Sequence, residues 1–384
     1  MKKRFIIFLL LCICNTAVWS DVANDKLGVI GTLPLPYPDH WVLAHDVGFN
    51  HMLNGKVIIL DAEQQTRNKQ YKGTYDTSLI ASVAIAKTRP EMYVYETFYT
   101  RGNRGTRTDV VTIYDKASLN VLDEIIIPGG KRAQMLPSDF TIHLIDDEKY
   151  LLLFNFTPST SVAVVDVEKR KMINEIDLPS CSLIYPTGKR GFSSICSDAS
   201  MVSYQLDKKG QVKNKSKIES FFSIDEDALF ERPVLIDGIA YFPTFNANLR
   251  EVDLRGDKAV PGKSWRLRTE EEAAANWRPG GMQLSGADSM GNLYLLMHDG
   301  GAEGTHKYPG AEVWVFDVKN QKRVRRIPLI MPGLVVEISQ DKSPYLFVTN
   351  VEMNIDVYDA LTGKHIRTMS DFGQETPLIL FSAN

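Results

Sequence analysis

The feature that most constrains the fold of this sequence is a recurring pattern of a β-forming run, an aspartate, a short polar turn and a second β-forming run. Alternating Val, Ile and Tyr residues favour half-buried strands. An aspartate side chain accepts hydrogen bonds from backbone N–H groups two residues on and so starts a turn. Each copy therefore predicts a β-hairpin. The seven copies are marked by Asp61, Asp115, Asp166, Asp207, Asp253, Asp317 and Asp359.

The spacing of these hairpins predicts the architecture. Consecutive aspartates lie 41 to 64 residues apart, and a period of about 40–50 residues leaves room for two more strands per copy, which makes one four-stranded propeller blade. Runs such as TIHLIDDEKYLLLFNF and GNLYLLMHD supply those strands. We therefore expect an all-β, seven-bladed β-propeller over residues 21–384, as a single domain. Segments near Leu27 and Leu378 are expected to close the ring by sharing a blade.

The N-terminus predicts the compartment. Three basic residues at positions 2–4 precede an apolar run over residues 5–14 and a short segment ending before Asp21, which is the order of a secretory signal peptide. A retained membrane anchor is the alternative, but the run is shorter than the roughly 20 residues that a span requires. We expect cleavage of residues 1–20 and a periplasmic mature chain with no membrane span.

Charge and cysteine content narrow the partners and the redox state. The chain has 44 Lys and Arg against 47 Asp and Glu, a formal charge of −3, which becomes −6 without residues 1–20. This acidity argues against nucleic acid, which favours a basic surface. Of the four cysteines, Cys181 and Cys196 remain in the mature chain. An even pair in an oxidising compartment predicts a disulfide, and two buried free thiols are the alternative.

Motifs for a self-contained active site are missing from the sequence. It contains no G-x-S-x-G, C-x-x-C, H-E-x-x-H or Gly-rich phosphate loop. His40, His45 and His51 have spacings that suit neither a helix face nor a strand face, so ordinary loop and core histidines are expected over metal ligands. The acidic run over residues 225–227 lacks the glycine and closing glutamate of a calcium loop and predicts a solvated turn. These observations favour a binding or scaffold subunit over a complete enzyme.

Several long segments resemble one family. EGTHKYPGAEVWVFDVKNQKRVRRIP, NWRPGG, RGTRTDVVTIYD and the cysteine segment LPSCSLIYPTGKRGFSSICSDAS are similar to the heavy chain of the tryptophan tryptophylquinone amine dehydrogenases. The resemblance runs across nearly the whole mature chain. It implies a seven-bladed heavy chain that assembles with a small, disulfide-rich light chain as two heavy plus two light chains.

The resemblance also implies a division of labour. The light chain would carry the tryptophan tryptophylquinone and the catalytic base, and this chain would bind no cofactor or metal and hold no catalytic residue. A primary amine would be oxidised to an aldehyde with release of ammonia, and the electrons would pass to a blue-copper protein, amicyanin or azurin. The GTHK segment and the aromatic residue after it favour aromatic amines over methylamine.

In the resembling family, an aromatic residue of the heavy chain lines the passage to the quinone. The matching position is Tyr99, with Phe98 second, in a loop expected after a strand-like run over residues 92–95. Packing of both rings under that loop is the alternative. Arg101, Arg104 and Arg107 are expected to pair with acidic groups of the light chain, unless they are solvated.

Two other functions fit an exported propeller. One is a stand-alone hydrolase with a metal on the ring axis, which would need convergent carboxylates there. The other is an interaction scaffold without amine chemistry. A short cysteine-rich light chain encoded near this chain would favour the amine dehydrogenase subunit over both.

Overall fold

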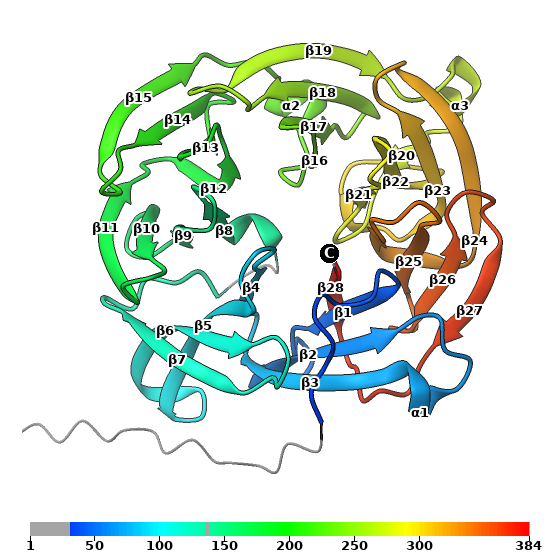
Figure 1. Cartoon of the computed structure of the whole chain (residues 1–384). Coiled ribbons are helices and arrows are strands. Elements are labelled where there is room, and N and C mark those ends of the chain that lie inside the picture. The colour runs from blue at the N-terminus through cyan, green and yellow to red at the C-terminus, as the bar shows by residue number, and fades with distance from the viewer. Residues whose placement is uncertain (1–30, 135–137, 384) are drawn as a thin grey trace, which may run out of the picture. The chain divides into compact units, whose positions relative to one another are not determined.

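Antiparallel sheets build almost the entire chain, which is described here from a computed structural model. The structure describes residues 31–134 and 138–383. Figure 1 shows the sheets around a common centre, each with its innermost strand toward that centre. No helix in these two ranges is long and apolar enough to cross a membrane.

Five of the sheets have four strands each. Ordered from the centre outward, their strands are β28 (Pro377–Ser382), β1 (Trp41–Asp46), β2 (Asn54–Asp61) and β3 (Tyr71–Ser78); β4 (Ser82–Ile85), β5 (Glu91–Arg101), β6 (Arg104–Asp115) and β7 (Val121–Ile127); β8 (Ile142–Ile145), β9 (Tyr150–Asn155), β10 (Ser161–Asp166) and β11 (Lys171–Asp177); β12 (Cys181–Pro186), β13 (Gly191–Cys196), β14 (Met201–Leu206) and β15 (Val212–Ile218); β16 (Val234–Ile236), β17 (Ile239–Pro243), β18 (Asn248–Asp253) and β19 (Val260–Arg266).

The remaining strands form one eight-stranded sheet. They are β20 (Arg278–Pro279), β21 (Ser285–Ala287), β22 (Asn292–His298), β23 (Gly310–Asp317), β24 (Lys322–Ile338), β25 (Tyr345–Asn350), β26 (Ile355–Asp359) and β27 (His365–Met369). The short helices of the described residues are α1 (Arg67–Gln70), η1 (Asp139–Thr141), α2 (Ile224–Asp227), α3 (Glu270–Ala274) and η2 (Thr305–Lys307).

The β-propeller prediction is confirmed, but the predicted number of blades is wrong. The structure has five separate four-stranded blades rather than seven, because the other eight strands are continuous through β24. The first half of this 17-residue strand pairs with β23 and its last residues pair with β25. The aspartate pattern marks where hairpins turn, but it carries no information about whether the backbone pairing stops between two neighbouring groups of strands.

The seven predicted hairpins are all present. Each pairs the strand before the aspartate with the strand after it. In each, a carboxylate oxygen of the aspartate accepts a hydrogen bond from a backbone N–H two or three residues on, at 2.6–3.1 Å. The aspartate turns therefore predict the position of each hairpin correctly.

The core lies between adjacent sheets. Strands in the second and third positions are buried on both faces, as in β9 and β10. The innermost strands are partly buried, as in β8 and β16, and the outermost strands are half exposed, as in β15. The largest fully buried side chain is Trp314. Side chains of neighbouring sheets share the same apolar clusters, so each sheet depends on its neighbours for burial.

The predicted disulfide is confirmed. Cys181 and Cys196 are bonded and lie directly opposite each other on β12 and β13. The bridge spans a sequence separation of 15 residues, for which the chain-entropy model gives about 3 kcal/mol of stabilisation.

The ring is closed between the first and last strands. β28 pairs antiparallel with β1, so a C-terminal strand is the innermost strand of the sheet that begins the described chain. This agrees with the expectation for the segment near Leu378, while the segment near Leu27 lies outside the described residues. At the closure the buried carboxylate of Asp46 accepts hydrogen bonds from the backbone N–H groups of Gly48, Glu375 and Thr376, at 3.2, 2.6 and 3.0 Å.

Replacing Asp46 should therefore weaken the closure. Asp46→Ala leaves three backbone donors without their acceptor, and we expect the free energy of unfolding to fall by about 3–5 kcal/mol. Asp359→Ala is the matched control, because Asp359 also caps a turn but at the surface, and should cost about 1 kcal/mol. If urea unfolding shows the same loss of free energy for Asp46→Ala and Asp359→Ala, the closure contributes no more stability than an ordinary surface turn.

Candidate functional site

The two ends of the strands form two different faces. Within each four-stranded sheet, counted from the centre outward, the aspartate turn joins the third strand to the fourth. Because the strands are antiparallel, the connection from the second strand to the third lies at the opposite end of the sheet. The connections from one sheet to the next lie at that same end. We call this end the loop face. Binding residues commonly collect on such connections because a rigid scaffold holds them in place.

The predicted channel residues lie on a hairpin that extends to the loop face. β5 does not end near Tyr95 as expected but continues to Arg101, and β6 begins at Arg104, so the predicted loop is a continuous two-stranded hairpin. Backbone pairing with β6 holds these residues in strand geometry, which the Gly and Arg content of the segment obscured. The Phe98 side chain is 45% exposed.

Tyr99 is held at its hydroxyl. Its side chain is half-buried, and its hydroxyl oxygen accepts a hydrogen bond from the Gln134 side chain at 3.2 Å. Gln134 lies in the connection between β7 and η1. Phe98 and Tyr99 are consecutive residues of β5, so the accessible Phe98 ring and the anchored Tyr99 ring lie on opposite faces of the hairpin end.

The three arginines predicted to pair with a light chain differ from one another. Arg101 and Arg104 are exposed at the tip of the hairpin. Arg107 instead makes a two-fold hydrogen bond to Asp109, at 2.9 and 3.0 Å, and donates a third to the carbonyl oxygen of Arg132. Its charge is therefore committed within this chain, which leaves Arg101 and Arg104 as the free charges of the set.

A residue that the sequence did not single out holds this hairpin in place. The buried guanidinium of Arg132 donates hydrogen bonds to Thr97 Oγ1 at 2.7 Å and to the carbonyl oxygens of Leu79 and Ile80 at 3.0 and 2.7 Å. Its backbone N–H donates to Asp109. Arg132 thus ties the β5–β6 hairpin to the neighbouring sheet connection. A single arginine in a Gly/Lys-rich segment gives no sequence signal for such a role.

The loop face carries nine of the nineteen large apolar side chains that are more than a third exposed in the described residues, and four of the five aromatic ones. The nine are Phe49, Met52, Leu53, Phe156, Ile224, Tyr308 and Val351 in the connections, Phe98 of β5 and Ile330 of β24. Phe49, Leu53 and Tyr308 are all more than half exposed. Exposed apolar residues grouped on one face mark a protein–protein contact more often than chance. The loop face is therefore the best candidate for a partner surface.

A second region of interest is the centre of the ring. A cavity of about 570 Å³ is lined there by inner strands, with Asp139, His143 and Glu337 among its side chains. Burial raises the pKa of Glu337 to about 8, with repulsion from Asp139 adding to the effect, and burial also raises the pKa of Asp139. Burial lowers the pKa of His143 to about 4. Within residues 31–134 and 138–383, no group of His, Cys, Asp and Glu side chains is arranged to hold a metal ion.

The histidines and the acidic run of the sequence stay apart. His40 stacks on Tyr345 and contacts Glu63, His45 is buried beside Thr77, and His51 faces Glu375. The structure does not bring the three together. The acidic run over residues 225–227 lies in α2, where the Ser223 hydroxyl accepts a hydrogen bond from a backbone N–H.

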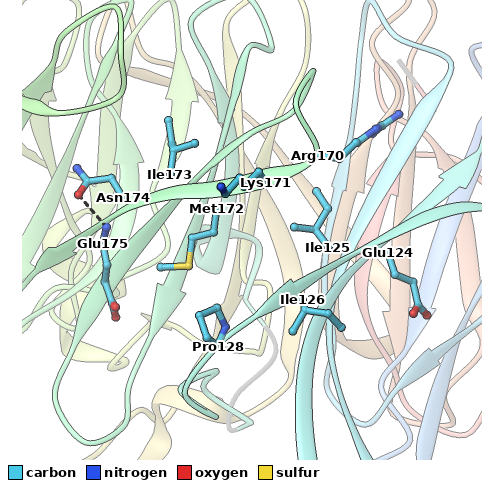
Figure 2. Close-up of a pocket in the computed structure, with 10 residues that line it drawn as sticks. All are labelled: Glu124, Ile125, Ile126, Pro128, Arg170, Lys171, Met172, Ile173, Asn174 and Glu175. Carbon is cyan, nitrogen blue, oxygen red and sulfur yellow. Dashed lines mark hydrogen bonds between the residues drawn. The ribbon is translucent and has the colours of Figure 1, made fainter. Parts of the chain in front are cut away.

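A groove on the outer rim is a third hollow (Figure 2). It has a volume of about 510 Å³ and lies between the outermost strands β7 and β11, with Ile126, Pro128 and Met172 on its floor. Two of its charged residues are engaged within this chain, because Arg170 pairs with Glu91 and Glu175 with Lys131. The other two, Glu124 and Lys171, are exposed and have opposite charges, so the groove shows no preference for a charged ligand.

Comparisons with known proteins identify the family. The model of the methylamine dehydrogenase heavy chain (MADH) matches residues 41–383. The chain belongs to the methylamine dehydrogenase heavy chain family. The heavy chain from Methylobacillus flagellatus is 30% identical over 382 residues, which cover 96% of this chain and 94% of that one. The heavy chain from Methylophilus methylotrophus is 28% identical and covers 83% and 78%. The resemblance stated from the sequence is thus confirmed.

Solved structures support the fold of this heavy chain family member. The β-propeller domain of Myceliophteria thermophila Cps50 (Swd1) superposes with a TM-score of 0.54 at 10% identity, covering 84% of this chain and 94% of that domain. Dihydro-heme d1 dehydrogenase NirN also gives 0.54, at 14% identity, covering 88% and 65%. At these identities the likeness concerns the fold alone.

The central cavity generates a pH prediction. Because folding raises the pKa of Glu337 to about 8, the folded state keeps a proton that the unfolded state loses above about pH 4.5. The stability that the protonated Glu337 carboxyl contributes is complete below about pH 4.5 and is lost as the pH rises to 8. Over that range the free energy of unfolding falls by up to about 1.4 kcal/mol per pH unit. Glu337→Gln should flatten the fall in unfolding free energy between pH 5 and 8. The surface variant Glu303→Gln should show the same fall in unfolding free energy as the wild-type chain. An unchanged slope in Glu337→Gln would contradict the assignment.

Proposed function

We propose that this chain is the heavy subunit of a periplasmic amine dehydrogenase and that its loop face seats the light chain. The observation that carries the proposal is the family match over residues 41–383, together with the exposed apolar side chains gathered on that face. The assembly would contain two heavy and two light chains. Residues 1–20, the proposed signal peptide, lie outside the described residues.

The chemistry would take place in the light chain. The light chain's tryptophan tryptophylquinone would supply the oxidant for a primary amine. One amine and one water would give aldehyde, ammonia, two protons and two electrons, and a blue-copper protein, azurin or amicyanin, would take the electrons one at a time. The role proposed for this chain is to hold the light chain in register and to form part of the wall of the substrate channel. The β5–β6 hairpin supports this role because it presents Phe98 and Tyr99 on a rigid support at the loop face.

Co-expression with a light chain tests the proposal. The purified complex should reduce a redox dye only when a primary amine is present and should show the visible absorbance of a quinone cofactor. The heavy chain expressed by itself should fold but show neither property. Amine turnover by the isolated heavy chain would refute the subunit assignment. A wild-type chain that captures no light chain would favour the interaction scaffold.

The selectivity of the complex tests the channel. If Tyr99 lines the passage, Tyr99→Ala should change the ratio of kcat/KM for an aromatic amine to that for methylamine, because pocket contacts set discrimination between substrates. Assembly and the quinone spectrum should stay intact. We propose that the wild-type ratio favours the aromatic amine, on the basis of the GTHK segment and the aromatic residue after it.

Tyr99→Phe is the matched control. It keeps the ring and removes only the hydroxyl that accepts a hydrogen bond from Gln134, so selectivity should change much less. If Tyr99 is instead a packing residue, Tyr99→Ala should cost roughly 3–5 kcal/mol of stability, as other truncations of buried aromatics do. A variant with wild-type selectivity and only reduced stability would contradict the channel role.

A further inference from the structure

We propose that Arg268 and Arg278 form a carboxylate-binding pair on the loop face, and that an acidic side chain of the light chain occupies it. This inference rests on the proposed function, since it names one anchoring point of the same partner. Neither arginine belongs to the set, Arg101, Arg104 and Arg107, that the sequence suggested for light-chain contacts.

The fold brings the Arg268 side chain to the backbone next to Arg278. Arg268 follows the end of β19, and Arg278 begins β20, where it pairs with His298 at the loop-face end of β22. One guanidinium N–H group of Arg268 donates a hydrogen bond to the carbonyl oxygen of Trp277, the residue before Arg278, at 2.8 Å. This bond fixes the Arg268 charge beside the Arg278 backbone.

The Arg278 side chain is held by packing rather than by a counter-ion. Its guanidinium lies over the Phe245 ring, 4.3 Å from the ring centre, and its aliphatic part passes close to Gly301. A Cβ atom at position 301 would lie 2.5 Å from Arg278 Cδ, so a glycine there is required for this approach. Packing of a planar guanidinium on an aromatic ring orients its N–H groups without using them.

Hydrogen-bond capacity is left over at both arginines. The Nε atoms of Arg268 and Arg278 are buried and have no hydrogen-bond partner. In the part of the chain that the structure describes, neither guanidinium takes part in an ion pair. Buried polar groups are usually satisfied, which makes these two side chains unusual. Both are only half-buried, so the outer N–H groups that these contacts leave unused can meet a partner at the surface.

The nearby carboxylates are already engaged. Glu270 pairs with Arg266, and Glu272 pairs with Arg323 and Arg326. The Asp227 oxygens accept hydrogen bonds from the Asn246 backbone and the Asn248 side chain, both at 2.8 Å. In the described residues none of these carboxylates forms an ion pair with Arg268 or Arg278, so attraction from Asp227 and Glu270 balances the positive charge of Arg268 only in part.

Electrostatics agree with this proposal. Burial lowers the pKa of Arg268, repulsion from Arg278 and Arg266 lowers it further, and attraction to Asp227 and Glu270 offsets only part of that effect. A carboxylate bound near Arg268 and Arg278 would reduce their mutual repulsion. Guanidinium groups bind carboxylates through paired, parallel N–H···O bonds, which suits a forked acidic side chain.

The surroundings favour a protein carboxylate over a free anion. Tyr308, 56% exposed, lies next to His298 and therefore next to Arg278. Ile224 of α2, 49% exposed, lies on the same face close to Asp227. Arginine and aromatic residues amid exposed apolar area are the usual composition of a protein–protein contact, whereas a free anion needs no apolar rim.

The test uses the co-expressed complex and the double variant Arg268→Gln/Arg278→Gln. We expect its dissociation constant for the light chain to rise about tenfold or more. The remaining affinity should vary less than that of wild type between about 0.05 and 0.5 M salt, because a charge contact has been removed. The control is Lys208→Gln/Lys209→Gln, which removes the same charge from two exposed side chains in the aspartate turn after β14, at the end opposite the loop face, and should change the dissociation constant much less.

Stability separates docking from folding. The double variant loses the Arg268–Trp277 hydrogen bond and the Arg278–Phe245 contact, but it also removes the repulsion between the two guanidinium groups. The Tm of the uncomplexed chain should therefore fall only slightly. If it fails to fold, Arg278→Gln alone carries the test, because it leaves the Arg268–Trp277 hydrogen bond intact. Wild-type light-chain affinity in either variant, with the wild-type chain itself assembling, would overturn the inference and leave the proposed function standing. If the wild-type chain captures no light chain, the proposed function fails and this inference fails with it.

Discussion

Antiparallel pairing of β28 with β1 is the contact on which the rest of the ring depends. Each sheet buries its two faces against its neighbours, so a row of sheets left open would expose an apolar face at each end. Joining the last strand to the first removes both exposed faces. The buried carboxylate of Asp46 secures this junction by binding three backbone N–H groups, two of them more than 300 residues away in sequence. We therefore expect the arrangement of the loop face to depend on this closure.

The hairpins could be predicted from sequence because their determinants are local. An aspartate that caps its own turn and alternating β-formers on both sides act within about ten residues, and all seven hairpins followed this rule. The predicted number of blades was wrong for a non-local reason. The first half of β24 pairs with β23 and its last residues pair with β25, which joins two groups of strands into one sheet. The prediction of a loop after Tyr95 failed for a similar reason. Pairing with β6 keeps β5 extended to Arg101 and outweighs the loop-forming character of the Gly and Arg residues.

Candidate site residues were harder to predict than the fold. A string of three arginines next to a glycine indicates a charged surface, but only the structure shows that Arg107 is already paired with Asp109. Conversely, Arg268 and Arg278 lie ten residues apart on either side of α3. Nothing in that spacing predicts that the Arg268 side chain reaches the backbone next to Arg278. The family itself was recognisable from sequence because its long segments are unusual in any propeller.

The central claim is that the loop face is where the light chain binds. Hydrogen–deuterium exchange of the heavy chain with and without the light chain tests it most directly, because protection upon binding maps the contact along the chain. The account predicts slower exchange in the loop-face connections, above all residues 47–53 and 299–309, with the aspartate turns unchanged. Protection confined to the aspartate turns, or spread over the outer strands, would contradict it.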